Sequence, residues 1–284
     1  MRKRDINAVI VLGCGKSIND LSSSEMEYIN RCKYVIAINK YMAFYDLVDI
    51  LPNMMYFHDE MDKNFNIYKY ILEKCHKDGL KELTVYTNPI FARLSSSYLY
   101  PVYNLYYKLR SYVKWYLFKK REWFPDTLYM NMPCRKLLKP DNAKIVPIRL
   151  ETLNSGQVWA KHLTDKMFNY KGSLSSILNL VTNIAPGCPV FLVGNDFGGA
   201  EYFFQKEWEM SPIYSEDFSV KIVKKKNTHM SFVPTDGHKT IADKMPFMIA
   251  KMLETNNRLY CVNPNSLLVI KAGVEYKKLP VDEK

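Results

Sequence analysis

The first residues that could do chemistry form a glycine-containing loop near the start of the chain. The loop follows an apolar run and contains Gly13, Cys14, Gly15 and Ser17. Glycines let the backbone approach a phosphate closely, and the N–H groups at the start of a following helix bind anions. The pattern lacks the third glycine of a dinucleotide fingerprint, and Ile10 stands where a P-loop has its first glycine. The loop therefore predicts either a nucleotide site or a tight structural turn.

An acidic run follows a later apolar segment. It contains His58, Asp59, Glu60 and Asp62. Closely spaced carboxylates can hold Mg²⁺ or Mn²⁺ against a diphosphate, but this spacing is more typical of a solvated acidic loop. His58 could instead form a hydrogen bond with a nucleotide. We expect neither a metal nor an organic cofactor.

A third candidate is a histidine that opens the last long helical pattern. Gly237 and His238 come first in this pattern, which covers residues 237–255. The positive end of a helix dipole disfavours the imidazolium, so a histidine in the first turn stays neutral near pH 7. A neutral imidazole is what a general base requires. His238 is therefore a candidate base, and a capping or surface histidine is the alternative. No comparable setting is found for His76, His162 and His229.

Strands and helices must position these residues, and their patterns alternate along the chain. Short apolar runs bounded by turn residues predict buried strands at residues 8–13, 34–39, 54–58, 83–87, 144–148, 189–194 and 258–262. Helical patterns lie between most of them, at residues 22–31, 64–76, 173–185 and 237–255. The alternation predicts an α/β fold with a doubly wound, mostly parallel, Rossmann-like sheet.

Two segments interrupt the alternation. Residues 98–124 are rich in aromatic and basic side chains and carry an apolar stripe at helical spacing, which predicts a helical excursion. This excursion could lie on a membrane surface or a partner subunit, or pack on the core. Residues 198–236 are polar and aromatic, and we expect them to form a mobile lid over the carboxyl ends of the strands. The nucleotide-binding domain would then comprise residues 1–197 and 237–284.

The composition limits the class of protein. The chain has 284 residues, 48% of them hydrophobic, and a formal net charge of +11. A basic chain favours an anionic partner such as a nucleotide, an anionic glycan, a lipid surface or nucleic acid. The apolar runs are too short to span a membrane, and the six cysteines occur singly. We expect a cytoplasmic enzyme, peripheral to the inner face of the membrane, that forms a homo-oligomer and keeps its thiols reduced.

Taken in order, several motifs resemble the bacterial sialyltransferases of glycosyltransferase family 42, the lipooligosaccharide sialyltransferases of mucosal pathogens. The opening Val-Ile-Val-Leu-Gly-Cys-Gly-Lys-Ser-Ile is similar to the family's CMP-binding loop. Residues 259–268, Leu-Tyr-Cys-Val-Asn-Pro-Asn-Ser-Leu-Leu, match the family's Leu-Tyr-Cys-Leu-Cys-Pro-Asn-Ser-Leu-Leu almost residue for residue. The segment from Gly237 to Asp243 resembles the stretch that carries the catalytic histidine.

The resemblance implies roles for individual residues. His238 would be the general base. The CMP donor would be held by the positions that match the family's donor-binding motifs: Gly13, Cys14, Gly15, Ser17, Asn39, His58, Ser173, Asn195, Asp196, Asn265 and Ser266. The family stabilises the leaving phosphate with two tyrosines, for which Tyr202 and Tyr214 are the candidates here.

The implied activity is a metal-independent, inverting transfer from a CMP donor to a glycan or glycolipid acceptor, on a variant of the GT-A fold. The donor sugar could be N-acetylneuraminate, another nonulosonate or Kdo. The motility accessory factors share parts of this core and are a further resemblance. Two other functions compete: an ATP-dependent kinase or pyrophosphokinase that uses the first loop with Asp59 and Asp62, and a nucleic-acid-binding module that uses residues 98–124. We favour the transferase and expect no nucleic-acid partner.

Overall fold

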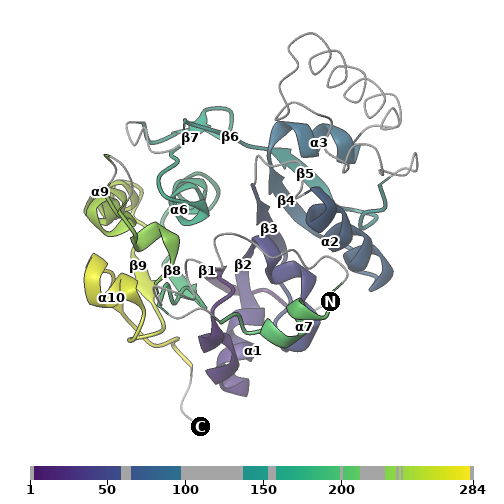
Figure 1. Cartoon of the computed structure of the whole chain (residues 1–284), viewed down its shortest axis with the longest axis horizontal. Helices are drawn as coiled ribbons and strands as arrows, with labels where there is room; N and C mark the ends of the chain where they lie inside the picture. Colours follow the sequence, from purple (N-terminus) through teal and green to yellow (C-terminus); the bar gives the residue numbers. More distant parts are fainter. Residues whose placement is uncertain are drawn as a thin grey trace. The chain divides into compact units, whose positions relative to one another are not determined.

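A computed structural model gives the fold of the chain (Figure 1). The structure describes residues 3–58, 65–96, 137–152, 158–198, 201–211, 228–234, 237 and 239–281. The chain divides into two compact units. The first comprises Met1–Tyr56 and Ile148–Lys284, and the second comprises Phe57–Pro147.

The architecture is α/β and is organised around one sheet of eight strands. Their order is β10-β9-β8-β1-β2-β3-β4-β5. The strands are β1 (Ile6–Leu12), β2 (Cys32–Ile38), β3 (Met54–Phe57), β4 (Thr84–Thr87), β5 (Lys144–Pro147), β8 (Val190–Val193), β9 (Leu259–Cys261) and β10 (Glu275–Tyr276). The register is parallel in each of the resolved pairs: Val11 lies opposite Ile36 of β2 and Leu192 of β8. The Rossmann-like sheet predicted from the sequence is therefore confirmed.

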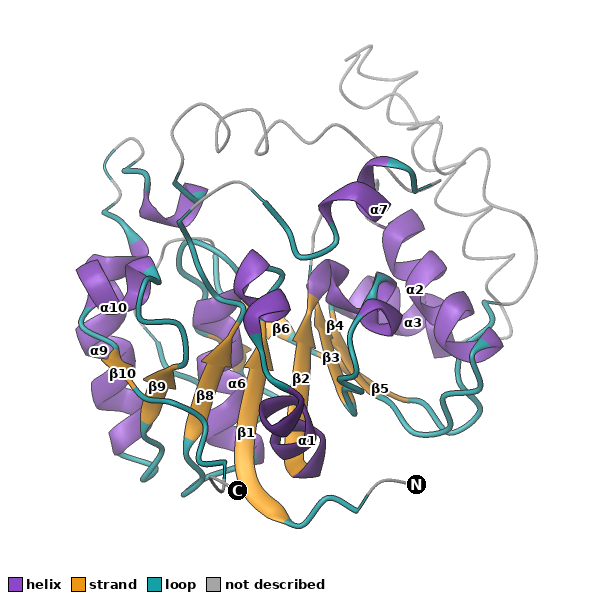
Figure 2. Cartoon of the chain, turned by 90° about the horizontal axis from the view of Figure 1, so that it is seen from below, coloured by secondary structure: helices purple, strands orange, loops and turns teal. Residues whose placement is uncertain are grey.

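Helices cover both faces of the sheet in the first unit. They are α1 (Ser23–Arg31), α6 (Ser173–Ile184), α7 (Gln205–Glu209), α9 (Ile241–Leu253) and α10 (Leu267–Ala272), with short 3-10 helices η1 (Lys16–Asp20), η2 (Asn39–Ala43), η3 (Tyr45–Leu47) and η6 (Met230–Phe232). Figures 1 and 2 show α1 on one face of β1 and β2, and α6 and α9 on the other. Because both faces are covered, Val9, Ile10, Val11 and Leu12 of β1 are completely buried, as expected of a central parallel strand.

Helix α6 is the central helix of the first unit, and every residue from Leu174 to Thr182 is buried. Its polar side chains are used to hold neighbouring backbone. The Asn179 amide accepts hydrogen bonds from the N–H groups of Ala160 and Phe168, both at 2.9 Å. These bonds fix the segment that contains β7 (Lys166–Met167), which pairs with β6 (Arg149–Leu150) in a two-stranded sheet. The sequence pattern did not predict this small sheet or β10.

The second unit contains β4 and β5 with helices α2 (Phe65–Lys77) and α3 (Pro89–Ser96). An aromatic cluster forms its core. The rings of Phe57, Phe65 and Phe91 all lie within about 6 Å of Tyr68, centroid to centroid. The Tyr68 hydroxyl shares a 2.8 Å hydrogen bond with Ser95, so the one polar atom of that buried ring is satisfied.

One predicted helix begins later than the sequence pattern indicated. Helix α9 starts at Ile241, not at residue 237. The backbone N–H and the hydroxyl of Thr240 donate hydrogen bonds to the Asp243 carboxylate at 2.8 and 2.7 Å, which closes a capping box. The predicted helix start at residue 237 is therefore wrong, and the helix-dipole argument for the pKa of His238 stays untested because this residue lies outside the described ranges.

Other predictions fall on residues that the structure does not describe. His238, Tyr214, the acidic residues 59–62 and the predicted excursion at residues 98–124 all lie outside the described residues. Within the described ranges, no helix has both the length and the apolar composition of a membrane span.

The capping box at the start of α9 can be tested directly. Replacing Thr240 with Ala removes the hydroxyl of the N-cap, so the free energy of unfolding should fall by about 1 kcal/mol. Lys239→Ala is the control, because the Lys239 side chain is exposed one residue earlier and caps nothing. Urea unfolding measures both. Equal stability of the two variants would place the helix start elsewhere.

Candidate functional site

The strand order places a topological switch point between β1 and β8. From β1 the sheet grows through β2 and β3 on one side, and it later grows through β8, β9 and β10 on the other. Parallel strands end at the same edge of a sheet, and doubly wound sheets bind ligands outside the carboxyl ends at this point. The candidate site is therefore built around two loops: the first loop, residues 13–17 after β1, and the loop at residues 194–198 after β8.

The glycines of the first loop allow these two loops to touch. Gly13 N–H donates to the Val193 carbonyl oxygen at 2.8 Å, and Gly15 N–H donates to the Gly194 carbonyl oxygen at 2.7 Å. A Cβ atom on Gly13 would lie 2.3 Å from the Gly194 carbonyl oxygen, which is far inside van der Waals contact. Glycine is therefore required because the first loop lies close to the end of β8. This is the contact expected if the motif is a structural turn.

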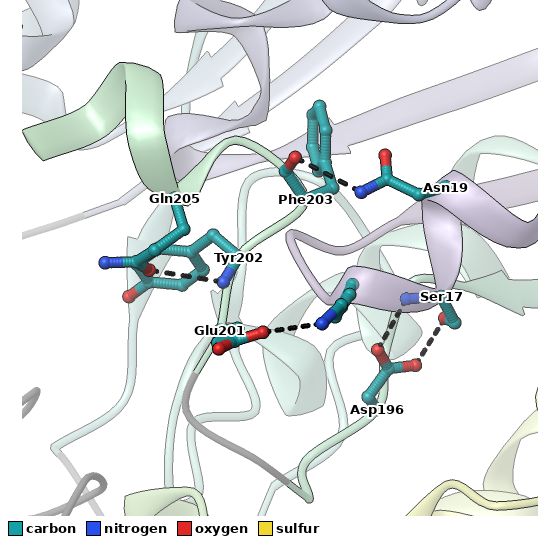
Figure 3. Close-up of polar contacts among 8 residues, drawn as sticks. Ser17, Asn19, Asp196, Glu201, Tyr202, Phe203 and Gln205 are labelled. Carbon is teal, nitrogen blue, oxygen red and sulfur yellow. Dashed lines mark hydrogen bonds and ion pairs between the residues drawn. The ribbon is translucent and has the colours of Figure 1, made fainter.

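A carboxylate occupies the hydrogen-bond donors of the first loop (Figure 3). Asp196 accepts a 3.0 Å hydrogen bond from Ser17 N–H and a 2.5 Å hydrogen bond from the Ser17 hydroxyl. Asn263, which follows β9, donates to the same carboxylate at 2.8 Å. Ser17 and Asp196 were both predicted to hold the nucleotide, but here they bind each other. A phosphate at Ser17 would have to displace this carboxylate or meet its charge.

Part of the predicted lid is packed tightly on the first loop. Tyr202 forms an antiparallel bridge with Gly15, and Phe203 N–H donates to the Cys14 carbonyl oxygen at 3.1 Å. Figure 3 shows Glu201, Tyr202 and Phe203 next to the loop that carries Ser17. The Glu201 carboxylate forms a 2.7 Å ion pair with Lys16. Residues 201–209 of the predicted lid therefore contact the first loop in this structure, the mobility of the lid stays a prediction, and residues 212–227 are outside the described part of the chain.

Aromatic side chains anchor residues 201–209 to the first unit. Phe204 and Trp208 are completely buried, and Phe204 stacks on Phe44 with a centroid distance of 4.3 Å. The ring of Tyr202, a predicted phosphate ligand, stacks on the ring of Phe204 with a centroid distance of 5.1 Å. The Lys40 ammonium lies 4.2 Å from the Trp208 ring centroid, a cation–π contact. The Tyr202 ring is half-exposed at the edge of this cluster.

The cysteine between the two glycines is not set up as a nucleophile. The Cys14 thiol lies 3.7 Å from the Ile38 carbonyl oxygen, to which it donates. Burial raises the pKa of the Cys14 thiol to about 12, although the nearby Lys40 opposes the shift. The thiolate is the reactive form, so Cys14 is inert at neutral pH. The contact of Cys14 with a CMP donor stays a prediction.

Two predicted ligand residues from distant parts of the sequence are brought together. Asn39, directly after β2, donates from its side-chain nitrogen to the Ser173 hydroxyl at 3.2 Å. Asn39 has φ 47°, a left-handed conformation that asparagine tolerates better than most residues. Gly172, with φ 118°, precedes α6 and offers no capping side chain to its first turn. The side-chain oxygen of Asn39 is buried and has no hydrogen-bond partner within the described residues.

Two predicted residues that follow β8 and β9 form hydrogen bonds between neighbouring strand ends. Ser266 is completely buried, and its hydroxyl donates to the Asn195 carbonyl oxygen at 2.7 Å while capping α10. The Asn195 side chain donates to the Val11 carbonyl oxygen at 2.9 Å, beneath the first loop. Ser266 and Asn195 therefore join β9 to β8 and β1, and their contact with a nucleotide stays a prediction. Asn265 is exposed beside them, and its proposed contact with a nucleotide stays a prediction.

A histidine that the sequence did not single out lies at this edge of the sheet. His229 N–H donates to the Phe197 carbonyl oxygen at 2.9 Å, and its ring meets the Phe197 ring at 5.0 Å and 84°. Ser231, two residues later, donates through its hydroxyl to the Lys171 carbonyl oxygen at the start of α6. No sequence motif marks His229. Its position depends on the contacts of residues 229 and 231 with Phe197 and Lys171, which are distant in the sequence.

The structure does not test the predicted roles of two further residues, His58 and His238. His58 follows β3 and belongs to the second unit, so its contact with a nucleotide stays a prediction. His238 is outside the described residues, but the next residue is anchored: the Tyr170 hydroxyl donates to the Lys239 carbonyl oxygen at 3.0 Å. Tyr170 lies two residues before Gly172, at the start of α6.

The close contact between the two loops makes a testable distinction between glycines. Gly13→Ala should lower the free energy of unfolding by about 3 kcal/mol or more, because backbone must move to relieve the overlap. Gly187→Ala is the control: its Cβ would meet nothing within 4 Å, and only its φ of 78° opposes a side chain, at a cost of about 1 kcal/mol. Chemical denaturation compares them, and equal losses would contradict the loop contact.

Comparisons with known proteins add no assignment. No protein-family profile, curated protein sequence or solved structure matches this chain. The activity must therefore be argued from the motifs in the sequence and from the residues that the fold gathers at the carboxyl edge of the sheet.

Proposed function

We propose that this chain is a glycosyltransferase that moves a sialic acid, another nonulosonate or a Kdo-type sugar from a CMP donor to a glycan acceptor. The observation that carries the proposal is the contact between Asn39 and Ser173. The sequence resemblance gives both residues to the donor, and their side chains meet at 3.2 Å beside the switch point of the sheet. Residues 134 positions apart thus share the location where this fold class binds nucleotides.

The local chemistry around Asn39 suits a polar ligand. Its buried side-chain oxygen lacks a partner within the described residues, so a ligand N–H or O–H that reached it would relieve a destabilising unpaired acceptor. Gly172 provides no side-chain cap to α6, so no capping side chain competes with a ligand for the N–H groups of the first turn. Donor and acceptor groups of a nucleotide could therefore both be satisfied here.

The proposed reaction is a direct displacement. The acceptor hydroxyl oxygen attacks the anomeric carbon and forms the new C–O bond, while the bond from that carbon to the phosphate oxygen breaks and its electron pair leaves with CMP. His238 takes the proton of the acceptor hydroxyl. The anchoring of Lys239 by Tyr170 supports this role, since it holds the residue next to His238 at the start of α6.

The competing kinase function is disfavoured by the first loop. In a P-loop, the hydroxyl at the end of the motif binds Mg²⁺ and backbone N–H groups cradle phosphates. Here both Ser17 donors bind the Asp196 carboxylate. A triphosphate placed on this loop would face that negative charge. Activity that survives EDTA would exclude a metal-dependent kinase.

Nucleotide selectivity gives the first test. CMP should stabilise the protein more than UDP or ATP, and at about 100 times its Kd it should add roughly 2.7 kcal/mol. Asn39→Ala should abolish most of this stabilisation. Asn7→Ala, at the opposite end of β1, should keep it. Thermal unfolding with and without each nucleotide measures the effect. Equal or greater stabilisation by ATP would exclude the CMP-dependent transferase.

The role of His238 gives the second test. His238→Ala should reduce turnover by about 10²- to 10⁴-fold, the usual contribution of a general base, while CMP binding is retained. Because a general base must be neutral to take a proton, turnover should fall as the pH drops through the pKa of His238. His162→Ala is the control at an exposed histidine. Near-normal turnover of His238→Ala, or a loss explained by failed CMP binding, would show that His238 is not the base.

A further inference from the structure

His229 is held in one orientation by three separate contacts. Its backbone N–H binds the Phe197 carbonyl oxygen, its ring packs edge-on against the Phe197 ring, and its Nδ1 accepts a 3.2 Å hydrogen bond from Ser231 N–H. Ser231 is in turn fixed to the Lys171 carbonyl oxygen. A surface histidine normally rotates freely, so this degree of restraint needs an explanation.

The contacts also fix the proton on the ring. Because Nδ1 accepts the Ser231 N–H, the neutral imidazole must carry its proton on Nε2. The packing of the ring against its neighbours lowers the pKa of His229, which favours this neutral form. His229 is nevertheless exposed overall, and Nε2 has no hydrogen-bond partner among the described residues. The side chain therefore presents a fixed, uncharged N–H donor.

The position of His229 connects it to the proposed donor site. Lys171 and Gly172 lie directly before Ser173, whose hydroxyl contacts Asn39. Lys171 and Phe197, which hold the histidine segment, both have φ 55°, a conformation that costs of order 1–3 kcal/mol for non-glycine residues and that often occurs at functional sites. His229 and Asn39 therefore flank the same helix start.

A nucleotide bound there needs donors for its phosphate, and the first loop does not supply the ones expected. The Ser17 N–H and hydroxyl are bound to Asp196, and the Gly13 and Gly15 N–H groups are bound to β8 and the loop after it. The N–H groups at the start of α6, and a side-chain donor beside them, are therefore candidates to bind the phosphate. An uncharged imidazole N–H is such a donor without the need for a protonated ring.

We propose that His229 donates its Nε2–H to an anionic phosphate oxygen of the bound nucleotide and does not act as a base. The inference rests on the proposed function and adds a residue that contacts the leaving group. In the transfer step the charge on this oxygen grows as the bond to the sugar breaks, so the hydrogen bond strengthens toward the transition state.

The test compares CMP with cytidine, which lacks the phosphate. His229→Phe keeps a ring against Phe197 but removes the donor, and His229→Gln replaces the donor with an amide N–H. Isothermal titration at pH 7.5 should show that His229→Phe weakens CMP binding by about 10- to 100-fold and leaves cytidine binding unchanged. His229→Gln should retain most of the CMP affinity. His162→Phe is the matched control and should change neither.

Turnover separates a donor from a base. His229→Gln should retain measurable transfer with the acid limb of its pH–rate profile unmoved, whereas a base at this position could not be replaced by an amide. Equal weakening of CMP and cytidine by His229→Phe would show a structural role only and would overturn the proposal. Equal affinity of the wild-type protein for cytidine and CMP would also overturn the proposal, because the phosphate would then add nothing to binding. Recognition of cytidine by the protein would still be supported. Failure of the wild-type protein to bind either one would overturn the proposed function as well.

Discussion

The carboxylate of Asp196 joins the loops that end three neighbouring strands. It binds the N–H and hydroxyl of Ser17 after β1, belongs itself to the loop after β8, and accepts from Asn263 after β9. Hydrogen bonds to an ionised acceptor are about twice as strong as neutral ones, so this group holds the carboxyl edge of β9, β8 and β1 as one surface. Gly13 and Gly15 then follow as necessities, because any side chain would force apart the loops that Asp196 draws together.

This arrangement moves the centre of the site away from the first loop. An internal carboxylate satisfies the anion-binding groups there, and residues 201–209 cover the loop with buried aromatic rings. The proposed ligand position lies toward β2 and the start of α6, where Asn39 contacts Ser173 and where Ser231, two residues after His229, binds the Lys171 carbonyl oxygen. In the proposed function, the first loop would form a wall of the site, and donors on the α6 side would contact the phosphate.

Apolar runs predicted all the major strands of the sheet because buried parallel strands are hydrophobic on both faces, and the turn residues around them mark their ends. The pairing of Asn39 with Ser173 could be expected only once the strand order was known. Other features follow only from the fold, because they join residues that are far apart in the sequence. Asp196 binds Ser17, and Phe204 and Trp208 pack against Phe44. The capping-box spacing of Thr240 and Asp243 indicates the true start of α9, whereas the helical pattern that begins at Gly237 predicts a start that is too early.

The asparagines of the first unit show where stability and function separate. At the amino ends of the strands they are satisfied on both sides of the amide. The Asn53 side chain accepts from Val35 N–H and donates to the Lys33 carbonyl oxygen, both at 2.9 Å, and Asn257 donates to two carbonyl oxygens while accepting from Thr255. At the carboxyl end of β2, Asn39 sits in a left-handed conformation with a buried oxygen that no described residue binds. Leaving such an acceptor unpaired costs roughly 1–3 kcal/mol, and the same chain avoids this cost at the opposite edge with the same residue type. A ligand that supplies the missing hydrogen bond would recover this free energy on binding, so the deficit at Asn39 favours binding at this edge of the sheet.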